Sequence, residues 1–175
     1  MKRKPYFLLG ILAIAGLVII LVYGLFYASK PDEIPSAQIR QKAKPFQTTT
    51  FDGQPISLQQ FRGQPIILNF WASWCVACRR EAHIIETAYQ KYRVKGAVFI
   101  GIAINDTREA SLAFIRRYGK TYLLAPDNKT GTISLDYGVT AVPETFLIDK
   151  NGIIMEKVLG AISKSDIEKF LSSQL

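Results

Sequence analysis

The chain has 175 residues, of which 49% are hydrophobic and 21% are charged, and its formal net charge is +8. This composition is that of a globular protein and excludes an intrinsically disordered chain. The length allows one domain of ordinary size and an accessory segment. The basic residues form no stripe with interleaved aromatic residues, so nucleic-acid binding is not expected.

The first predicted element is a long apolar helix near the N-terminus. Residues 5–29 contain no charged side chain, and as a helix they would be about 37 Å long, more than the roughly 30 Å of bilayer hydrocarbon. A cleaved signal peptide would have a shorter apolar core and small residues at its cleavage site, which this run lacks. We therefore expect residues 6–28 to be a transmembrane signal-anchor that follows a cytoplasmic N-terminus of residues 1–5.

Charged residues beside this run predict its orientation. Lys2, Arg3 and Lys4 precede it, and basic residues tend to stay on the cytoplasmic side of a membrane. The anchor would then cross the bacterial cytoplasmic (inner) membrane once and place the rest of the chain on the periplasmic, extracytoplasmic side, where disulfide chemistry is supported. Residues 29–44 are polar, contain two prolines and are predicted to be a linker.

Residues 45–175 are predicted to form one α/β domain. A short hairpin is expected around Asp52-Gly53. The nearly continuous apolar runs 65–71 and 97–104 are typical of parallel strands that are buried on both faces. Between them, apolar residues recur at helical spacing from 75 to 92, so the three elements should form a right-handed βαβ unit.

The C-terminal part is predicted to add a helix, two strands and a last helix. The first of these helices is expected at 107–118. Strands at 145–149 and 153–159 flank a Lys-Asn-Gly turn and should form a hairpin. The last helix is expected to begin near Ser163, which has a capping-box pattern with Asp166. The result would be a central mixed sheet flanked by helices, with an N-terminal hairpin.

Both cysteines lie in the segment NFWASWCVACRRE, residues 69–81, where the first buried strand leads into its helix. Cys75 should stand at the helix start, where backbone N–H groups and the helix dipole favour the reactive thiolate. Cys78 follows one turn later, so the two Cα atoms should be about 5 Å apart, which is within the range of a disulfide.

Three kinds of site are compatible with this pair: a redox-active disulfide, a structural disulfide and part of a metal site. A structural disulfide stabilises by closing a loop, and this loop is almost the shortest possible. A zinc site usually needs four ligands, and the one histidine, His83, is expected on a different side of the helix from the two sulfur atoms. We therefore favour a redox-active Cys75–Cys78 disulfide and expect no metal or other cofactor.

The segment NFWASWCVACRRE resembles the active-site segment of thioredoxin-like proteins, and GVTAVPETFLIDKNG at 138–152 resembles the segment that carries their cis-proline. With the N-terminal anchor and hairpin, the chain resembles the membrane-anchored TlpA, ResA and CcmG (DsbE) group of thiol-disulfide oxidoreductases. The resemblance covers about residues 45–175 and implies a thioredoxin-like fold there.

The resemblance also implies a role for each site residue. Cys75 would attack the disulfide of a client protein, and Cys78 would then resolve the mixed disulfide. Trp74 would pack beside the sulfur atoms and shape the client surface. Pro143 would be cis and face the cysteines, and the backbone of Val142 would pair with an extended client strand.

The sequence departs from thioredoxin in several places. A Val-Ala pair replaces the Gly-Pro pair between the cysteines, and Asn69 stands where thioredoxins carry a buried aspartate, so the usual candidate base for the resolving thiol is missing. Glu144 resembles the acidic residue of the CcmG subgroup; it could act on Cys78 if it lies close, or it could be solvated. Glu81 is expected to balance the charge at the helix start.

The resemblance predicts an enzyme that reduces client disulfides, such as that of apocytochrome c during cytochrome c biogenesis. A membrane transporter of reducing equivalents, similar to CcdA or DsbD, would reduce the pair again. The Val-Ala pair provides no side-chain donor to stabilise a thiolate as strongly as an oxidant requires. Two alternatives remain open: a metal (copper) delivery partner that uses the reduced pair, and a thiol peroxidase, because the N-terminal hairpin also resembles peroxiredoxins.

Overall fold

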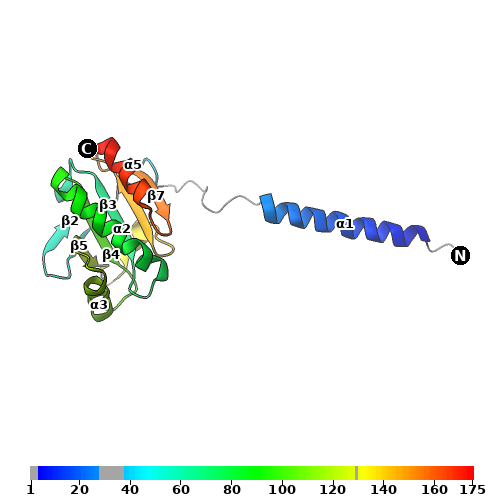
Figure 1. Cartoon of the computed structure of the whole chain (residues 1–175), viewed down its shortest axis with the longest axis horizontal. Helices are drawn as coiled ribbons and strands as arrows, with labels where there is room; N and C mark the ends of the chain where they lie inside the picture. Colours follow the sequence, from blue (N-terminus) through cyan, green and yellow to red (C-terminus); the bar gives the residue numbers. More distant parts are fainter. Residues whose placement is uncertain (1–3, 28–37, 129) are drawn as a thin grey trace. The chain divides into compact units, whose positions relative to one another are not determined.

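The computed structural model describes residues 4–27, 38–128 and 130–175. The chain divides into two units, one up to Pro35 and one from Ser36 onward. Figure 1 labels α1 of the first unit and several of the helices and strands of the second. Because the two units are separate, each is described by itself.

The N-terminal unit contains one helix, α1 (Lys4–Tyr27), whose side chains are described at residues 7 and 9–24. Within the described residues, no helix is long and apolar enough to cross a membrane. The last residue of the predicted anchor 6–28 and most of the predicted linker lie outside the described residues. The membrane anchor therefore stays a prediction.

The second unit is built on a five-stranded sheet that mixes parallel and antiparallel pairs (Figure 1). The spatial order of its strands is β5 (Leu123–Pro126), β4 (Val98–Ala103), β3 (Ile66–Trp71), β6 (Glu144–Ile148) and β7 (Ile154–Leu159). The central pair, β3 and β4, is parallel and buried along its whole length, as the continuous apolar runs predict. β6 and β7 form the predicted antiparallel hairpin. The thioredoxin-like α/β fold is confirmed.

One face of the sheet packs against α2 (Val76–Tyr92), α3 (Arg108–Tyr118) and α5 (Lys164–Gln174). Each helix begins at a side chain that accepts a hydrogen bond from the first turn. The residues at these starts are Cys75, Thr107 and Ser163, and Ser163 forms the predicted capping box with Asp166. The helix boundaries therefore follow from local sequence.

The opposite face is covered by shorter elements. They are the hairpin of β1 (Gln47–Thr49) and β2 (Pro55–Ser57), the 3₁₀ helix η2 (Leu58–Phe61) and the short helix α4 (Thr132–Asp136). Apolar side chains from this hairpin and from α4 pack against β3 and β6. A second 3₁₀ helix, η3 (Arg93–Lys95), follows α2.

Besides the two 3₁₀ helices, one strand and one helix of this unit are absent from the sequence-based prediction. β5 has only four residues and is defined by its parallel pairing with β4, a long-range contact that local sequence does not report. α4 has five residues. The structure also pairs the end of the predicted linker with the sheet: Arg40 and Ala43 donate backbone hydrogen bonds to residues 154 and 152.

Candidate active site

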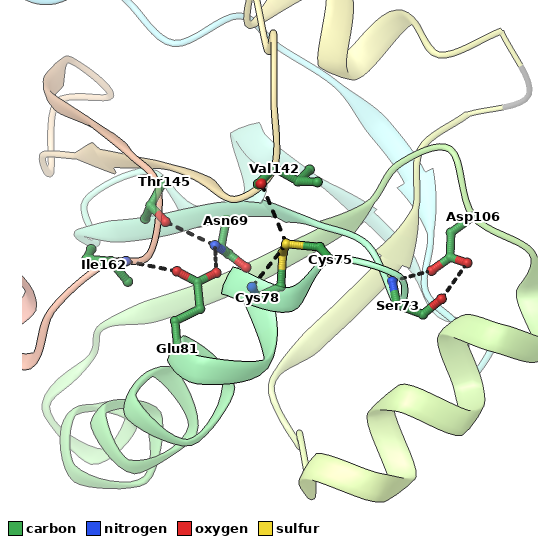
Figure 2. Close-up of a disulfide and its surroundings, with 9 residues drawn as sticks. All are labelled: Asn69, Ser73, Cys75, Cys78, Glu81, Asp106, Val142, Thr145 and Ile162. Atoms are coloured by element: carbon green, nitrogen blue, oxygen red, sulfur yellow. Dashed lines mark hydrogen bonds between the residues drawn. A yellow bond between two sulfur atoms is a disulfide. The ribbon is translucent and has the colours of Figure 1, made fainter. Parts of the chain in front are cut away.

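Cys75 and Cys78 form a disulfide at the end of β3, where α2 begins (Figure 2). Their Cα atoms are 5.3 Å apart, as the helical spacing predicts. Cys75 is the N-cap residue of α2, and its sulfur accepts a hydrogen bond from the backbone N–H of Cys78 at 3.0 Å. A helix start favours negative charge, so it stabilises a thiolate on Cys75 once the disulfide is reduced.

Exposed apolar side chains flank the two cysteines. Cys75 and Cys78 are 5% and 2% exposed, whereas Trp74 and Val76 are 56% and 67% exposed. The indole N–H of Trp74 donates to the carbonyl oxygen of Asn105 at 3.0 Å, which fixes the position of the ring. Trp74 thus lies at the surface directly before Cys75, as an exposed apolar side chain beside the disulfide.

The peptide bond between Val142 and Pro143 is cis, as the resemblance predicts. The carbonyl oxygen of Val142 lies 3.5 Å from the sulfur of Cys75 (Figure 2). A disulfide sulfur has no hydrogen to donate, but the reduced thiol of Cys75 can donate to this oxygen. The cis-proline segment therefore borders the sulfur of Cys75.

Asp106 attaches the loop before the cysteines to the region that precedes α3. Its carboxylate accepts hydrogen bonds from the backbone N–H and the hydroxyl of Ser73, at 2.7 and 2.8 Å (Figure 2). It also accepts one from the hydroxyl of Ser111. The sequence analysis did not assign Asp106 to the site, because nothing in the sequence brings it beside Ser73. It is a positioning residue of the active-site loop.

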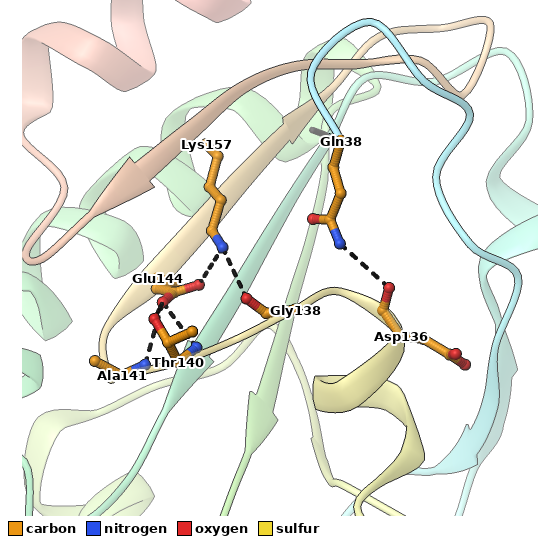
Figure 3. Close-up of polar contacts among 7 residues, drawn as sticks. All are labelled: Gln38, Asp136, Gly138, Thr140, Ala141, Glu144 and Lys157. Carbon is orange, nitrogen blue, oxygen red and sulfur yellow. Dashed lines mark hydrogen bonds and ion pairs between the residues drawn. The ribbon is translucent and has the colours of Figure 1, made fainter. Parts of the chain in front are cut away.

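Glu144 is buried, and its described hydrogen bonds and ion pair do not involve Cys78. Its carboxylate accepts hydrogen bonds from the backbone N–H and hydroxyl of Thr140 and from the N–H of Ala141, and it pairs with Lys157 at 2.8 Å (Figure 3). The suggested solvated position is therefore wrong, since Glu144 is 1% exposed. None of its described contacts supports an action on Cys78; Glu144 shapes the site through the loop that leads to the cis-proline.

Glu81 is the buried acid beside the disulfide, and the expectation that it balances the helix start is wrong. It lies one helical turn after Cys78 on the same face of α2, and it is 1% exposed. Its carboxylate accepts hydrogen bonds from the side-chain amide of Asn69 and from the backbone N–H of Ile162, both at 2.9 Å. Burial raises the pKa of Glu81 to about 7, so this acid can exchange a proton near neutral pH.

Asn69 connects Glu81 to β6. Its amide nitrogen donates to both Glu81 and the hydroxyl of Thr145, while its buried amide oxygen has no hydrogen-bond partner within the described residues. Figure 2 shows this oxygen turned toward the start of α2. An amide cannot take up a proton, so of these two residues only Glu81, through its carboxylate, can accept one.

A signal for Glu81 exists in the sequence. Cys78, Ala82 and Ile85 are buried residues of α2, and Glu81 lies three residues after Cys78 and four before Ile85. A carboxylate within the apolar stripe of a helix must be buried, and a buried carboxylate beside a thiol pair is a candidate acid–base group.

The AhpC/TSA family model matches residues 39–157. The chain belongs to the AhpC/TSA family. This family member is 33% identical to the thiol-disulfide oxidoreductase ResA of Bacillus anthracis over 170 residues, which cover 97% of this chain and 95% of the relative. It is also 33% identical to the thiol:disulfide interchange protein DsbE of Pseudomonas fluorescens biotype C over 162 residues, or 92% and 88% of the two chains.

A solved structure indicates the same kind of protein as these relatives. A thiol:disulfide interchange protein of Chlorobium tepidum, assigned to DsbE, superposes with a TM-score of 0.73 at 26% identity, covering 79% of this chain and 99% of the other. This AhpC/TSA family member is thus a thiol-disulfide oxidoreductase with a thioredoxin-like fold, similar to the ResA and DsbE group.

Proposed function

We propose that the chain reduces disulfides of client proteins outside the cytoplasm, with apocytochrome c as one client. The observation that carries the proposal is the disulfide of Cys75 and Cys78 at the start of α2, next to the buried Glu81. A strong oxidant needs a heavily stabilised reduced form. Here the sulfur of Cys75 accepts one described hydrogen bond, from the N–H of Cys78, which supports a reductant.

The reaction follows from the positions of these groups. The thiolate of Cys75 attacks one sulfur of the client disulfide, a mixed disulfide forms, and the other client sulfur leaves as a thiolate. Glu81 takes the proton of Cys78, whose sulfur then attacks Cys75. This step releases the second client thiolate and closes the Cys75–Cys78 disulfide. The client keeps the two electrons that it gains, and a membrane transporter of reducing equivalents similar to CcdA or DsbD supplies two further electrons that reduce the Cys75–Cys78 disulfide again.

Trapping of clients tests the function. In Cys78→Ser the mixed disulfide cannot be resolved, so clients should accumulate on Cys75 and be identifiable by mass spectrometry after non-reducing separation. The matched control Cys75→Ser should trap none and should lose disulfide reduction. Normal turnover by Cys75→Ser would rule out the mechanism, and recovery of no cytochrome c precursor would rule out apocytochrome c as a client.

We also propose that residues 6–28 anchor the chain in the cytoplasmic membrane with residues 1–5 in the cytoplasm. Support comes from the uncharged run 5–29 and the three basic residues before it, and the alignment with ResA covers 97% of this chain. Protease added to spheroplasts should cleave the C-terminal domain. Without protease, the full chain should be found in the membrane fraction. Recovery of the full chain in the soluble fraction would contradict the anchor.

The match to the AhpC/TSA family keeps thiol peroxidase as a second candidate. Peroxide turnover by the reduced chain, measured beside disulfide reduction, separates the two activities. Copper delivery has less support, because no group of three or more His, Cys, Asp or Glu side chains gathers as a metal site within the described residues. Tight binding of Cu(I) by the reduced pair would favour it.

A further inference from the structure

Lys120 is a buried lysine between α3 and β5, on the side of the sheet that carries the disulfide. Gly119, with φ of +62°, ends α3 and turns the chain inward. The next residue, Thr121, donates its backbone N–H and its hydroxyl to the carboxylate of Glu86 on α2, at 2.8 and 2.6 Å. These contacts fix the backbone on both sides of Lys120, and the side chain enters the core with 6% exposure.

Aromatic rings surround the ammonium group of Lys120. Its nitrogen lies 3.8 Å from the ring centroid of Trp71, 5.2 Å from that of Tyr122 and 5.3 Å from that of Phe114. Within the described residues it forms no ion pair. Cation–π contacts stabilise a desolvated ammonium group, but by less than the hydration that it loses on burial. A nearby negative charge should therefore have a large effect on whether the ammonium group of Lys120 stays ionised.

Strand β3 connects the three rings around Lys120, here called the aromatic cage, to the redox site. Trp71 and Asn69 are two residues apart on β3, so their side chains lie on the same face, and Asn69 holds the carboxylate of Glu81. Opposite Asn69 in the register stands Gly101 of β4. A Cβ at Gly101 would lie 3.0 Å from the ring of Tyr122 and 3.1 Å from the indole nitrogen of Trp71, so the cage occupies the space that a side chain there would need.

The two buried charges interact directly through space. Burial lowers the pKa of Lys120 to about 7, and Glu81 opposes this change. Burial raises the pKa of Glu81 to about 7, and Lys120 opposes that change in turn. In a medium of low polarizability, opposite charges interact over longer distances than in water.

Most other groups around Lys120 and Glu81 are uncharged. Burial raises the pKa of Tyr122 well above its ordinary value, so its hydroxyl stays neutral. Glu86 interacts with Lys120, but its carboxylate is half-buried and bonded to Thr121. The groups that face the pair from β3, β6, α3 and the segment before α5 are uncharged: Asn69, Trp71, Thr145, Phe114 and the N–H of Ile162.

We propose that Lys120 is a positioning residue of the redox site, whose buried ammonium group favours the ionised carboxylate of Glu81 and so sets the pH range in which Cys78 loses its proton. The inference rests on the proposed role of Glu81 as the acceptor of that proton. Removal of the positive charge leaves Glu81 protonated up to a higher pH, and a protonated carboxyl cannot accept a proton. The attack of Cys75 on the client does not use Glu81 and stays unchanged.

Single-turnover kinetics of the full reduced chain with 5,5′-dithiobis(2-nitrobenzoate) separate the two steps, because Cys75 releases the first thionitrobenzoate and Cys78 the second. In Lys120→Met the midpoint of the pH profile of the second release should rise by about one unit, which slows this release about tenfold below the midpoint. The first release should keep its rate. Lys95→Met, which also removes a lysine beside an aromatic ring but at an exposed position, should leave both releases unchanged.

Two further measurements distinguish this role from a structural one. Glu81→Gln/Lys120→Met should show the same pH profile as Glu81→Gln alone, because Lys120 acts only through Glu81. In the wild-type chain, NMR titration of the Glu81 carboxyl and the Lys120 ε-carbon should show two coupled steps. Independent titrations, or a folded Lys120→Met with the wild-type midpoint, would overturn the inference. A chain that releases thionitrobenzoate as expected but reduces no protein client would instead refute the proposed function and leave the pairing of Lys120 with Glu81 intact.

Discussion

At the scale of the residue, the proposed mechanism assigns the activation of the second cysteine to the buried carboxylate of Glu81. Cys75 needs no separate base, because it stands at the start of α2. Cys78 lies inside the first turn and is 2% exposed, so its thiol must lose a proton where water has little access. Glu81, one turn further along, is held by Asn69 and Ile162 and has a pKa of about 7.

Glu81→Gln should therefore slow resolution of the mixed disulfide while attack by Cys75 stays intact. We expect a loss of about a hundredfold in the second step, the usual contribution of a general base. Non-reducing electrophoresis during turnover should show the client–enzyme mixed disulfide, which the wild type does not accumulate. Glu109→Gln, at an exposed position of α3, is the control. Unchanged resolution in Glu81→Gln would exclude Glu81 as the base.

The residues of the site differ in how far sequence predicts them. The cysteines, Trp74 and the cis-proline follow from motifs that are local in the chain. Asp106 and Lys120 could not be assigned, because Asp106 reaches Ser73 across 33 positions and Lys120 reaches Trp71 from another element. The sequence left open whether Glu144 lies close enough to act on Cys78, and in the structure its hydrogen bonds direct it to Thr140 and Ala141.

At the scale of the element, the loop that carries the cis-proline is held by one buried ion pair. Glu144 begins β6 and Lys157 belongs to the neighbouring β7, and their side chains are 1% and 9% exposed. The carboxylate also accepts hydrogen bonds from the loop residues Thr140 and Ala141. The pair thus joins the hairpin to the segment that borders Cys75.

Glu144→Gln should destabilise the domain by about 3 kcal/mol, because it leaves the ammonium group of Lys157 buried without its counter-charge. Urea unfolding measures this loss, and Glu156→Gln on the exposed side of β7 should cost little. The pH profile of the second thionitrobenzoate release should keep its midpoint, since none of the described polar contacts of Glu144 involves Cys78. A shifted midpoint would revive the sequence-based suggestion that Glu144 acts on the resolving thiol.

The elements themselves were predicted where their signals are local. β3 and β4 are apolar along their whole length, and α3 and α5 begin at capping side chains, so their types and positions follow from sequence. β5 was missed because its four residues form a strand only through pairing with β4. α4 was missed because five residues are too few for a helical period to emerge.

At the scale of the whole molecule, the stability of the domain should depend on pH through Glu81 and Lys120. The pKa of Glu81 is about 7 in the folded chain and near 4.5 when unfolded, so the folded state binds more protons between these values. The free energy of unfolding should then fall as pH rises from 4.5 to 7, by about 3 kcal/mol. The pKa of Lys120 is also about 7 when folded and near 10.5 when unfolded, so stability should rise again above pH 7.

Urea unfolding of the oxidised chain from pH 4 to 10 tests this dependence. The contribution of the pair should give a minimum near pH 7. Glu81→Gln should remove the decrease on the acid side, and Lys120→Met should remove the increase on the alkaline side. If both variants keep the wild-type curve, neither group has the altered acidity that burial predicts.

The backbone bonds of residues 40–43 to residues 152–154 have a mechanical consequence. They fasten the incoming chain beside Ile154, which pairs with Ile148, which in turn pairs with the first residue of β3. The sulfur atoms follow the last residue of β3, so the strand separates the two places by roughly 17 Å. The N-terminal segment is therefore attached to the domain near the start of β3, whereas the disulfide lies beyond the end of this strand. An anchor on that segment would leave the disulfide accessible to partner proteins.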